Sequence, residues 1–399
     1  MKKIVLLLIL IIILTQTSTV AEIRSEYIGF YNGWNQNTYP SIGIASSVDG
    51  LKWGKSISPL LTSRTNLFDS RNLNGPYPIT VGNYIYLYYA AYNGTKWEGI
   101  GLTIFTKDMK IISRPRKPVL SLGVQGNWDD TKVFRPIIIY DSKALDSNKR
   151  FKMIYTGGNI NGINQAGLAY SPDGVIWTKY SNNPIIANGQ DTWDSIWVMP
   201  DNIIKIDDIY YIVYNGYNGT DVLTGIATAS TIEGDWTKYA SNPVLSNRPN
   251  AIQILTQDTS SAIIHVNDSS VFEINEPCYL TSTAGTENVR VKLKPSSTTI
   301  ELYESPIYTH TISGNASIKS ILSKQVGPNQ IEYDGFKWKI YGSSWGVISP
   351  YETTTYAEGT TLDNMQWIYE KMPTLNYDTV SSDWDSVSQE NLKFITINR

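Results

Sequence analysis

The sequence is poor in the residues on which several enzyme classes depend. Its 399 residues include one cysteine, Cys278, and two histidines, His265 and His310. A lone cysteine excludes an intrachain disulfide and thiol-ligated metal clusters. Both histidines fall between residues 248 and 322. The rest of the chain therefore has no imidazole for a Ser-His-Asp triad or a His-ligated metal site.

Charged residues are also scarce. They make up 17% of the chain, the formal net charge is −3, and there is no run of lysine or arginine. Nucleic acid is therefore not an expected partner, because its phosphate backbone is bound by clustered positive charge. No glycine-rich phosphate loop is present. We expect a monomer without cofactor; whether a structural Ca²⁺ binds is left open, because acidic spacing does not decide it.

The N-terminus has the features of a secretory leader. Lys2 and Lys3 precede an apolar run over 4–14 and a small polar stretch that ends at Ala21. This pattern predicts a signal peptide over 1–21. An uncleaved anchor is the alternative, because the run and its extension almost reach the length of a membrane span. Either way, the protein is expected to be secreted or at the cell surface, with no other membrane segment.

A repeated unit dominates the remainder, and its landmarks recur in constant order. The first is an aromatic-Asp pair at Asp69, Asp129, Asp194 and Asp385. The second is a proline that leads a short apolar strand, at Pro76, Pro136, Pro200 and Pro328. An aromatic strand with a Gly/Asn loop follows, then a tight turn before Trp53, Trp177, Trp236 or Trp367. A tag closes each unit, at Pro59, Pro118, Pro184, Pro243 and Pro373.

Each unit predicts four antiparallel strands, because alternating apolar and β-branched residues are separated by Gly, Asn and Asp turns. Five such units predict an all-β, five-bladed β-propeller, in which only short edges stay unpaired. The first unit lacks its aromatic-Asp element, which instead stands near the C-terminus before the strand-like residues 392–397. We therefore expect this C-terminal strand to pair beside 27–31 and close the ring.

One segment breaks the repeat. Residues 248–322 contain strand-like stretches at 261–266, 271–274, 288–293, 298–303 and 308–312. They predict a small β-sandwich-like module, since compact insertions at loop tips are well tolerated. The predicted domains are 22–247 for blades one to four, 248–322 for the module, and 323–399 for blade five with the closing strand.

Propeller geometry gathers certain residues at one end. The loops after the aromatic strands carry Trp34, Trp97, Tyr217 and Trp345, and the inner strands start with Asn74, Arg135, Asp201 and Glu390. Aromatic faces beside planar polar groups suit a sugar. For the loop tryptophans, ligand contact and packing between loops are equally open. The repeated tryptophans are expected to be structural, and the repeated aspartates to cap turn amides.

The repeat resembles a known family. The series Arg135-Pro136, Met153 to Tyr155, Gly167 to Gly174 with Trp177, and Asn183-Pro184 is similar to the five-bladed propeller glycosidases of the glycoside hydrolase 43 and 32 type. This resemblance covers both stretches outside the module. It implies a carboxylate base, a second Asp and a Glu acid on early inner strands. Blade two, however, offers Asn74 and Gly75 where an Asp would be expected, and blade five offers Asn329.

Two functions follow from this incomplete set. In the first, an extracellular glycosidase-like protein uses Asp201 and Glu390 as a carboxyl pair, with Arg135 keeping one ionised. In the second, the propeller has lost its catalytic carboxylates and binds a glycan or cell-surface partner without turnover. For Asp201 and Glu390, loop capping is the structural alternative. Carbohydrate is the expected partner in both cases.

Overall fold

The computed structural model describes residues 25–34, 39–48, 52–190, 192–245, 251–320, 325–345, 353–367, 374–375 and 388–398. Within these ranges the regular structure is β, with short 3-10 turns and no α-helix. No helical segment among them is long and apolar enough to cross a membrane. The predicted leader over 1–21 lies outside the described residues.

Most strands form four-stranded antiparallel units. One unit is β4 (Asn72–Val81), β5 (Tyr84–Tyr92), β6 (Trp97–Thr106) and β7 (Ile111–Ser113), with β8 (Leu120–Ser121) also on β6. The next is β9 (Lys132–Tyr140), β10 (Phe151–Gly158), β11 (Asn164–Ser171) and β12 (Thr178–Lys179), with the 3-10 turn η1 (Ser147–Lys149). A third is β13 (Trp197–Ile206), β14 (Ile209–Tyr217), β15 (Val222–Ala229) and β16 (Thr237–Lys238). A fourth is β23 (Gln325–Tyr333), β24 (Trp338–Trp345), β25 (Thr353–Gly359) and β26 (Gln366–Trp367), with η5 (Leu362–Asn364).

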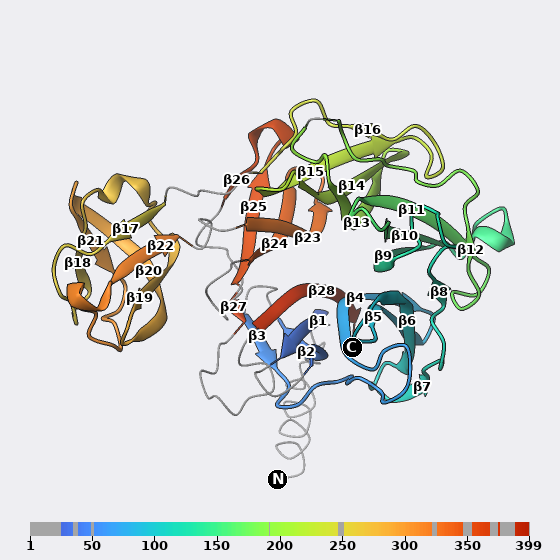
Figure 1. Cartoon of the computed structure of the whole chain (residues 1–399), viewed down its shortest axis with the longest axis horizontal. Coiled ribbons are helices and arrows are strands. Elements are labelled where there is room, and N and C mark those ends of the chain that lie inside the picture. Colours follow the sequence, from blue (N-terminus) through green and yellow to red (C-terminus); the bar gives the residue numbers. More distant parts are fainter. Residues whose placement is uncertain are drawn as a thin grey trace, which may run out of the picture.

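Another sheet joins the two ends of the chain. Its strands are β28 (Ser388–Asn398), β1 (Ser25–Trp34), β2 (Ser41–Ser47), β3 (Lys52–Lys55) and β27 (Thr374–Leu375). β28 runs antiparallel to β1, with Tyr27 opposite Thr396 and Ile28 opposite Ile395. The predicted pairing of 392–397 with 27–31 is therefore confirmed, and the red β28 lies beside the blue β1 (Figure 1).

Neighbouring units meet along their inner strands. Trp97 of β6 pairs in parallel with Lys132 of β9, and Asn164 of β11 pairs with Trp197 of β13. The inner strands β28, β4, β9, β13 and β23 make contacts in that order, and β23 also contacts β28. The starts of the inner strands therefore share one end with the loops between the second and third strands (Figure 1).

Each inner strand is interrupted by a β-bulge near its start. The register shifts between Asn74 and Tyr77 in β4, opposite Ile154 to Thr156 in β9, and between Pro200 and Asn202 in β13. The repeated prolines lie at these bulges, inside the strands, so the prediction that they lead the strands was wrong. Proline cannot donate to the ladder, and a bulge removes that requirement.

The repeated aspartates tie strands together inside each unit. Asp69, Asp129 and Asp194 are buried, and each accepts a hydrogen bond from a second-strand tyrosine hydroxyl and from a cationic side chain, whereas Asp385 lies outside the described residues. The groups are Asp69 with Tyr89 (3.0 Å) and Arg114 (2.9 Å), Asp129 with Tyr155 (3.0 Å) and Lys179 (2.6 Å), and Asp194 with Tyr214 (3.0 Å) and Lys238 (2.7 Å). For these three aspartates the predicted capping of turn amides was therefore wrong, because a buried carboxylate needs a cation as well as hydrogen bonds; at Asp385 it stays a prediction.

The repeated tryptophans are structural, as predicted, wherever their side chains are described. Trp53 is buried against Tyr31 and Ala45. Trp177 donates from Nε1 to the Gly174 carbonyl (3.0 Å), and Trp236 likewise to the Ile232 carbonyl (3.1 Å). The side chain of Trp367 lies outside the described part of the chain.

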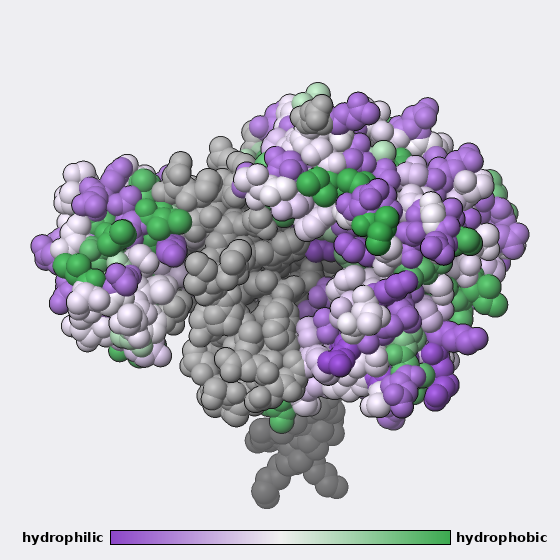
Figure 2. Space-filling model, viewed as in Figure 1, coloured by the Kyte–Doolittle hydropathy of each residue, from purple (hydrophilic) through white to green (hydrophobic). Residues whose placement is uncertain are grey.

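A separate six-stranded sheet occupies the segment that breaks the repeat. Its strands are β17 (Ile252–Ile254), β22 (Ser317–Ser320), β19 (Pro277–Ser282), β20 (Gly285–Ser296), β21 (Thr299–Leu302) and β18 (Ile263–His265), in that order. The amide of Thr256 donates to the His265 carbonyl (2.8 Å), so the two edges approach each other around a core of their own. Figure 1 shows this sheet set apart from the others, and Figure 2 shows apolar groups on its visible face.

Some predicted strands of this module were wrong. Residues 271–274 follow the 3-10 turn η2 (Ser269–Val271), with Phe272 buried in the core. Residues 308–312 lead into η3 (Ile312–Gly314) and form no strand beyond a single bridge at His310. The sequence pattern also missed β17, β19 and β22. The predicted boundaries at 248 and 322 lie outside the described residues.

The buried ties make a prediction about stability. Replacing Asp129 (Asp129→Ala) leaves Lys179 and the Tyr155 hydroxyl without their carboxylate, so unfolding free energy should fall by about 3–5 kcal/mol. Urea unfolding followed by tryptophan fluorescence measures the change. The control Asp235→Ala, at an exposed position, should leave the midpoint unchanged. Equal midpoints for the two variants would contradict the role given to Asp129.

Candidate functional site

A buried ion pair lies at the bulged starts of the inner strands. Nη1 of Arg135 in β9 is 2.8 Å from both carboxylate oxygens of Asp201 in β13. Asp201 is 5% exposed, and it also accepts a hydrogen bond from Nδ2 of Asn215. Two opposite charges attract strongly where water is largely excluded. The pair therefore holds Asp201 as an oriented carboxylate between two units.

Arg135 adopts a backbone conformation that side chains avoid. Its φ is 51°, and Gly75, at the matching place in the bulge of β4, has a φ of 56°. Glycine occupies this region freely, whereas a non-glycine residue there costs roughly 1–3 kcal/mol when held in place by its surroundings. The backbone strain is therefore present at Arg135 and absent at Gly75. The guanidinium of Arg135 is therefore a requirement of the site.

Two asparagines extend the polar contacts on both sides of this pair. Asn32 donates to the Leu73 carbonyl (2.6 Å) and accepts from the Gly75 amide (2.8 Å), which joins β1 to β4. A side chain at Gly75 would come within 3.9 Å of Arg135. Gly75, which is bonded to Asn32, therefore lies next to Arg135, which is paired with Asp201.

A further hydrogen bond links two inner strands that are not sequence neighbours. Nδ2 of Asn202 in β13 lies 3.4 Å from the hydroxyl of Tyr77 in β4. The Oδ1 atom of Asn215 is buried and receives no hydrogen bond within the described structure. This atom is therefore a buried acceptor without a protein donor, on the amide whose Nδ2 bonds Asp201.

Asn32 and Asn215 were missed by the sequence analysis. They hold the same position in two second strands, each directly after the tyrosine opposite the bulge. The signal was the dipeptide Tyr31-Asn32 and its counterpart Tyr214-Asn215 in the aromatic strands. These aromatic strands read as core throughout, so the one position in each strand that lies next to the bulge did not stand out.

The residues predicted at the inner-strand starts do not occupy one equivalent position. Glu390 lies opposite Asn32, and Asn74 lies opposite Ala90, both just before the bulge. Arg135 and Asp201 belong to the bulges themselves. The bulge changes which residue faces the axis, so a simple alignment of repeats cannot give the set. The side chain of Glu390 lies outside the described residues.

Aromatic rings border the same end of the units. Trp97 stacks on Phe134 at 5.8 Å between ring centroids and contacts Tyr92 at 5.2 Å. Tyr217, the last residue of β14, packs on Trp197 at 4.3 Å. These rings are half-buried, so packing between strands and an open face occur together. Trp34 and Trp345 end β1 and β24 at the corresponding places, but their side chains are not among those described.

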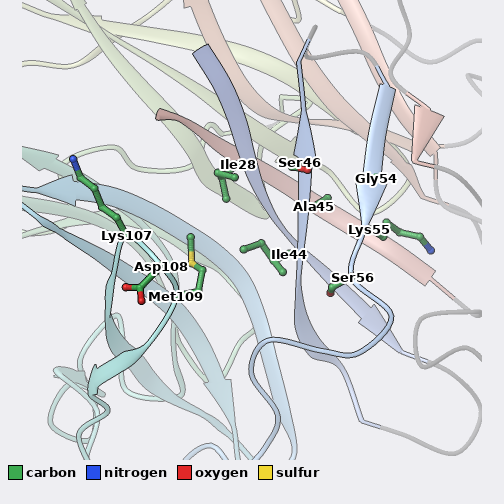
Figure 3. A pocket seen from close by; sticks show the side chains of 10 residues that line it. All are labelled: Ile28, Ile44, Ala45, Ser46, Gly54, Lys55, Ser56, Lys107, Asp108 and Met109. Carbon is green, nitrogen blue, oxygen red and sulfur yellow. The ribbon is translucent and has the colours of Figure 1, made fainter. Parts of the chain in front are cut away.

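A hollow of about 420 Å³ lies at the other end of the units, between β2, β3 and the turn after β6. Figure 3 shows Ile28, Ile44 and Met109 directed into it, while the amines of Lys55 and Lys107 point away. Its lining is therefore mainly apolar, without the convergent polar groups that a sugar requires. Nowhere in the described ranges do three His, Cys, Asp or Glu residues converge as metal ligands would.

Comparison with known proteins gives sequence relatives and structural neighbours that act on carbohydrates. No family model matches the chain. A segment of 109 residues is 31% identical to a 1,2-beta-oligomannan phosphorylase of Thermoanaerobacter, covering 25% of this chain and 34% of that protein. A beta-1,2-mannobiose phosphorylase of the same organism is 26% identical over 121 residues. The chain thus matches about a third of the length of these curated relatives.

Two solved structures of carbohydrate-active enzymes align with most of this chain. An endo-1,4-beta-xylanase from Bacteroides thetaiotaomicron aligns over 70% of this chain and 91% of its own, with 15% identity and a TM-score of 0.44. A thermostable family-43 glycoside hydrolase aligns over 71% of this chain and 96% of its own, with 16% identity and a TM-score of 0.43.

The ion pair makes the next prediction. Arg135→Ala removes the cation beside a buried carboxylate and should lower the unfolding free energy by about 3–5 kcal/mol. The double variant Arg135→Ala/Asp201→Asn should lose less than the sum of the single losses, because no buried charge is then left unpaired. Urea unfolding of all four proteins gives the coupling. The exposed pair Lys205 and Asp208 is the control and should show almost none; additive losses at Arg135 and Asp201 would contradict the coupling.

Proposed function

We propose that the four-stranded units are the blades of a five-bladed β-propeller closed by β28. The support is the pairing of β28 with β1 and the cyclic order of contacts among inner strands. A propeller gives an axial mouth at the end where the inner strands start. Arg135, Asp201 and the asparagines lie at that end.

The proposed function is that of an extracellular carbohydrate-active protein whose glycan lies in this mouth. One observation carries it: the oriented, buried carboxylate of Asp201 is bonded to Arg135 and to the Asn215 amide, at the end of the units that half-buried aromatic rings also border. Amides and carboxylates bind sugar hydroxyls, and aromatic faces pack against sugar C–H groups. Trp97, Tyr217, Trp34 and Trp345 would supply such faces, and Asn74 a further polar contact.

Glycoside cleavage is the chemistry that this site would perform. Arg135 stabilises the charged form of Asp201, which suits a base that activates water or a nucleophile that attacks the anomeric carbon. Glu390 would then protonate the leaving oxygen. Such carboxyl pairs stand roughly 5 to 9.5 Å apart, depending on whether configuration is retained or inverted. β28 brings the backbone of Glu390 to the inner strand of the first unit, opposite Asn32.

A non-catalytic glycan binder is the second candidate, and Gly75 favours it. This position and Asn74 supply no carboxylate where the glycosidase pattern carries an Asp. Asp201 is also held by Arg135 and Asn215, as a structural carboxylate would be. In both candidates we propose that residues 1–21 direct the protein out of the cytoplasm as a signal peptide or anchor, and that it acts as a monomer.

Turnover decides between the two candidates. The full mature chain is incubated with xylan, arabinan and β-1,2-mannobiose, with and without inorganic phosphate, and reducing sugar and sugar phosphate are measured. Hydrolysis that needs no phosphate is expected, and Asp201→Asn should lower the rate by about 10²-fold or more, as loss of a catalytic base does. Asp235→Asn should leave the rate unchanged. If sugar phosphate forms, and only when inorganic phosphate is present, the reaction is phosphorolysis and the proposed hydrolysis is wrong.

Glycan binding provides a separate prediction. Trp97→Ala removes a ring that borders the mouth, and it should weaken oligosaccharide binding about 3- to 10-fold, as expected for one aromatic contact. Isothermal titration calorimetry measures the affinity. Trp236→Phe changes a ring at the other end of its unit and is the matched control. If oligosaccharide binds but no substrate is turned over, the protein is a non-catalytic glycan binder. If Trp97→Ala and Trp236→Phe bind with equal affinity, the glycan does not contact Trp97.

A further inference from the structure

The six-stranded module contains a Ser-His-Glu arrangement that the propeller lacks. Nδ1 of His310 lies 2.9 Å from Oγ of Ser282, and Nε2 lies 2.8 Å from Oε1 of Glu287. Ser282 ends β19, Glu287 lies in β20 two residues after the turn, and His310 comes from the segment before η3. Three separate parts of the module therefore supply one continuous hydrogen-bonded row.

The carboxylate end of this row is firmly held. Oε2 of Glu287 accepts the amide of Ile307 (2.8 Å), and Oε1 accepts the amide of Tyr308 (3.1 Å). These bonds to N–H donors are made to an ionised carboxylate, which in turn fixes the proton of His310 on Nε2. Nδ1 is then left as an acceptor, and the hydroxyl of Ser282 is the donor that faces it. This is the proton arrangement that activates a serine hydroxyl.

The histidine is fixed and the serine is accessible. His310 is fully buried, and its backbone is paired with Thr259 in both directions at 2.8 Å. Ser282 is only half-buried, and the next two residues of its hairpin, Thr283 and Ala284, are exposed. The Ala284 amide donates to Oγ of Ser282 (3.1 Å), which fixes the direction of the hydroxyl.

We propose that Ser282 is a nucleophile for short acyl esters, with His310 as its base and Glu287 as the residue that positions the base. Oγ attacks the carbonyl carbon, its proton moves to Nδ1, and the bond to the alcohol breaks as the alcohol takes that proton. Water then attacks the acyl-serine by the same proton route, releases the carboxylic acid and restores Ser282. The exposed hairpin suits an acyl group carried on a larger molecule. This activity is independent of the function proposed for the propeller.

The test uses the whole mature chain. A fluorophosphonate probe should label Ser282, as located by peptide mass spectrometry, and p-nitrophenyl acetate should be hydrolysed. Ser282→Ala should abolish both. Ser313→Ala, at an exposed serine of the same module, should change neither.

Glu287→Gln separates a positioning role from a structural one. The single oxygen of the new amide can accept from only one of the two backbone amides, Ile307 and Tyr308, so a modest fall in melting temperature is expected. Labelling of the folded variant should slow far more, by about 10²-fold or more, because the histidine tautomer is no longer ordered. The proposal is overturned if folded protein shows no labelling of Ser282, or if Ser282→Ala retains the parent rate of ester hydrolysis.

Discussion

The bulge near the start of each inner strand is the constraint on which the site depends. In β4, β9, β13 and β23 a proline lies at this bulge, where its missing N–H costs the ladder no hydrogen bond. β28 bulges at the corresponding place without a proline. The bulge turns two consecutive residues toward the neighbouring units. Arg135 in β9 and Asp201 in β13 meet for this reason. In a regular ladder, two consecutive residues point to opposite faces of the sheet, so only one of them could face a given neighbouring unit.

The buried aspartate ties keep these bulges in register. Asp129 and Asp194 each bond the hydroxyl of the tyrosine that stands opposite the bulge. Burial raises the pKa of Tyr155 and of Tyr214 well above the usual range, so both remain hydrogen-bond donors. The same tyrosine therefore connects a structural carboxylate to the polar site. The repeated residues are the structural ones, namely the aspartates and their tyrosines. The residues proposed to be functional, Arg135 and Asp201, lie in the bulges and vary from unit to unit.

Features that recur in every unit could be predicted from the sequence, whereas the positions of the residues that differ between units could not. Strand order, the structural tryptophans and the pairing of β28 with β1 followed from landmarks that recur. The positions of Glu390 and Asp201 did not, because the bulge offsets them by different amounts relative to the second strand. Within the module no repeat was available, and alternation alone confused the packed segment around Phe272 with a strand.

The distribution of ionisable groups assigns different chemistry to the two parts of the chain. Where the propeller is proposed, the described polar site has one cation, Arg135, and its charge is matched by Asp201. A phosphate would have to compete with Asp201 for Arg135, and it would gain no net positive charge from the pair. The neutral pair instead favours an uncharged polyol, which is bound through hydrogen bonds and ring faces. The Arg135–Asp201 pair therefore supports the proposal that the ligand is a sugar without phosphate.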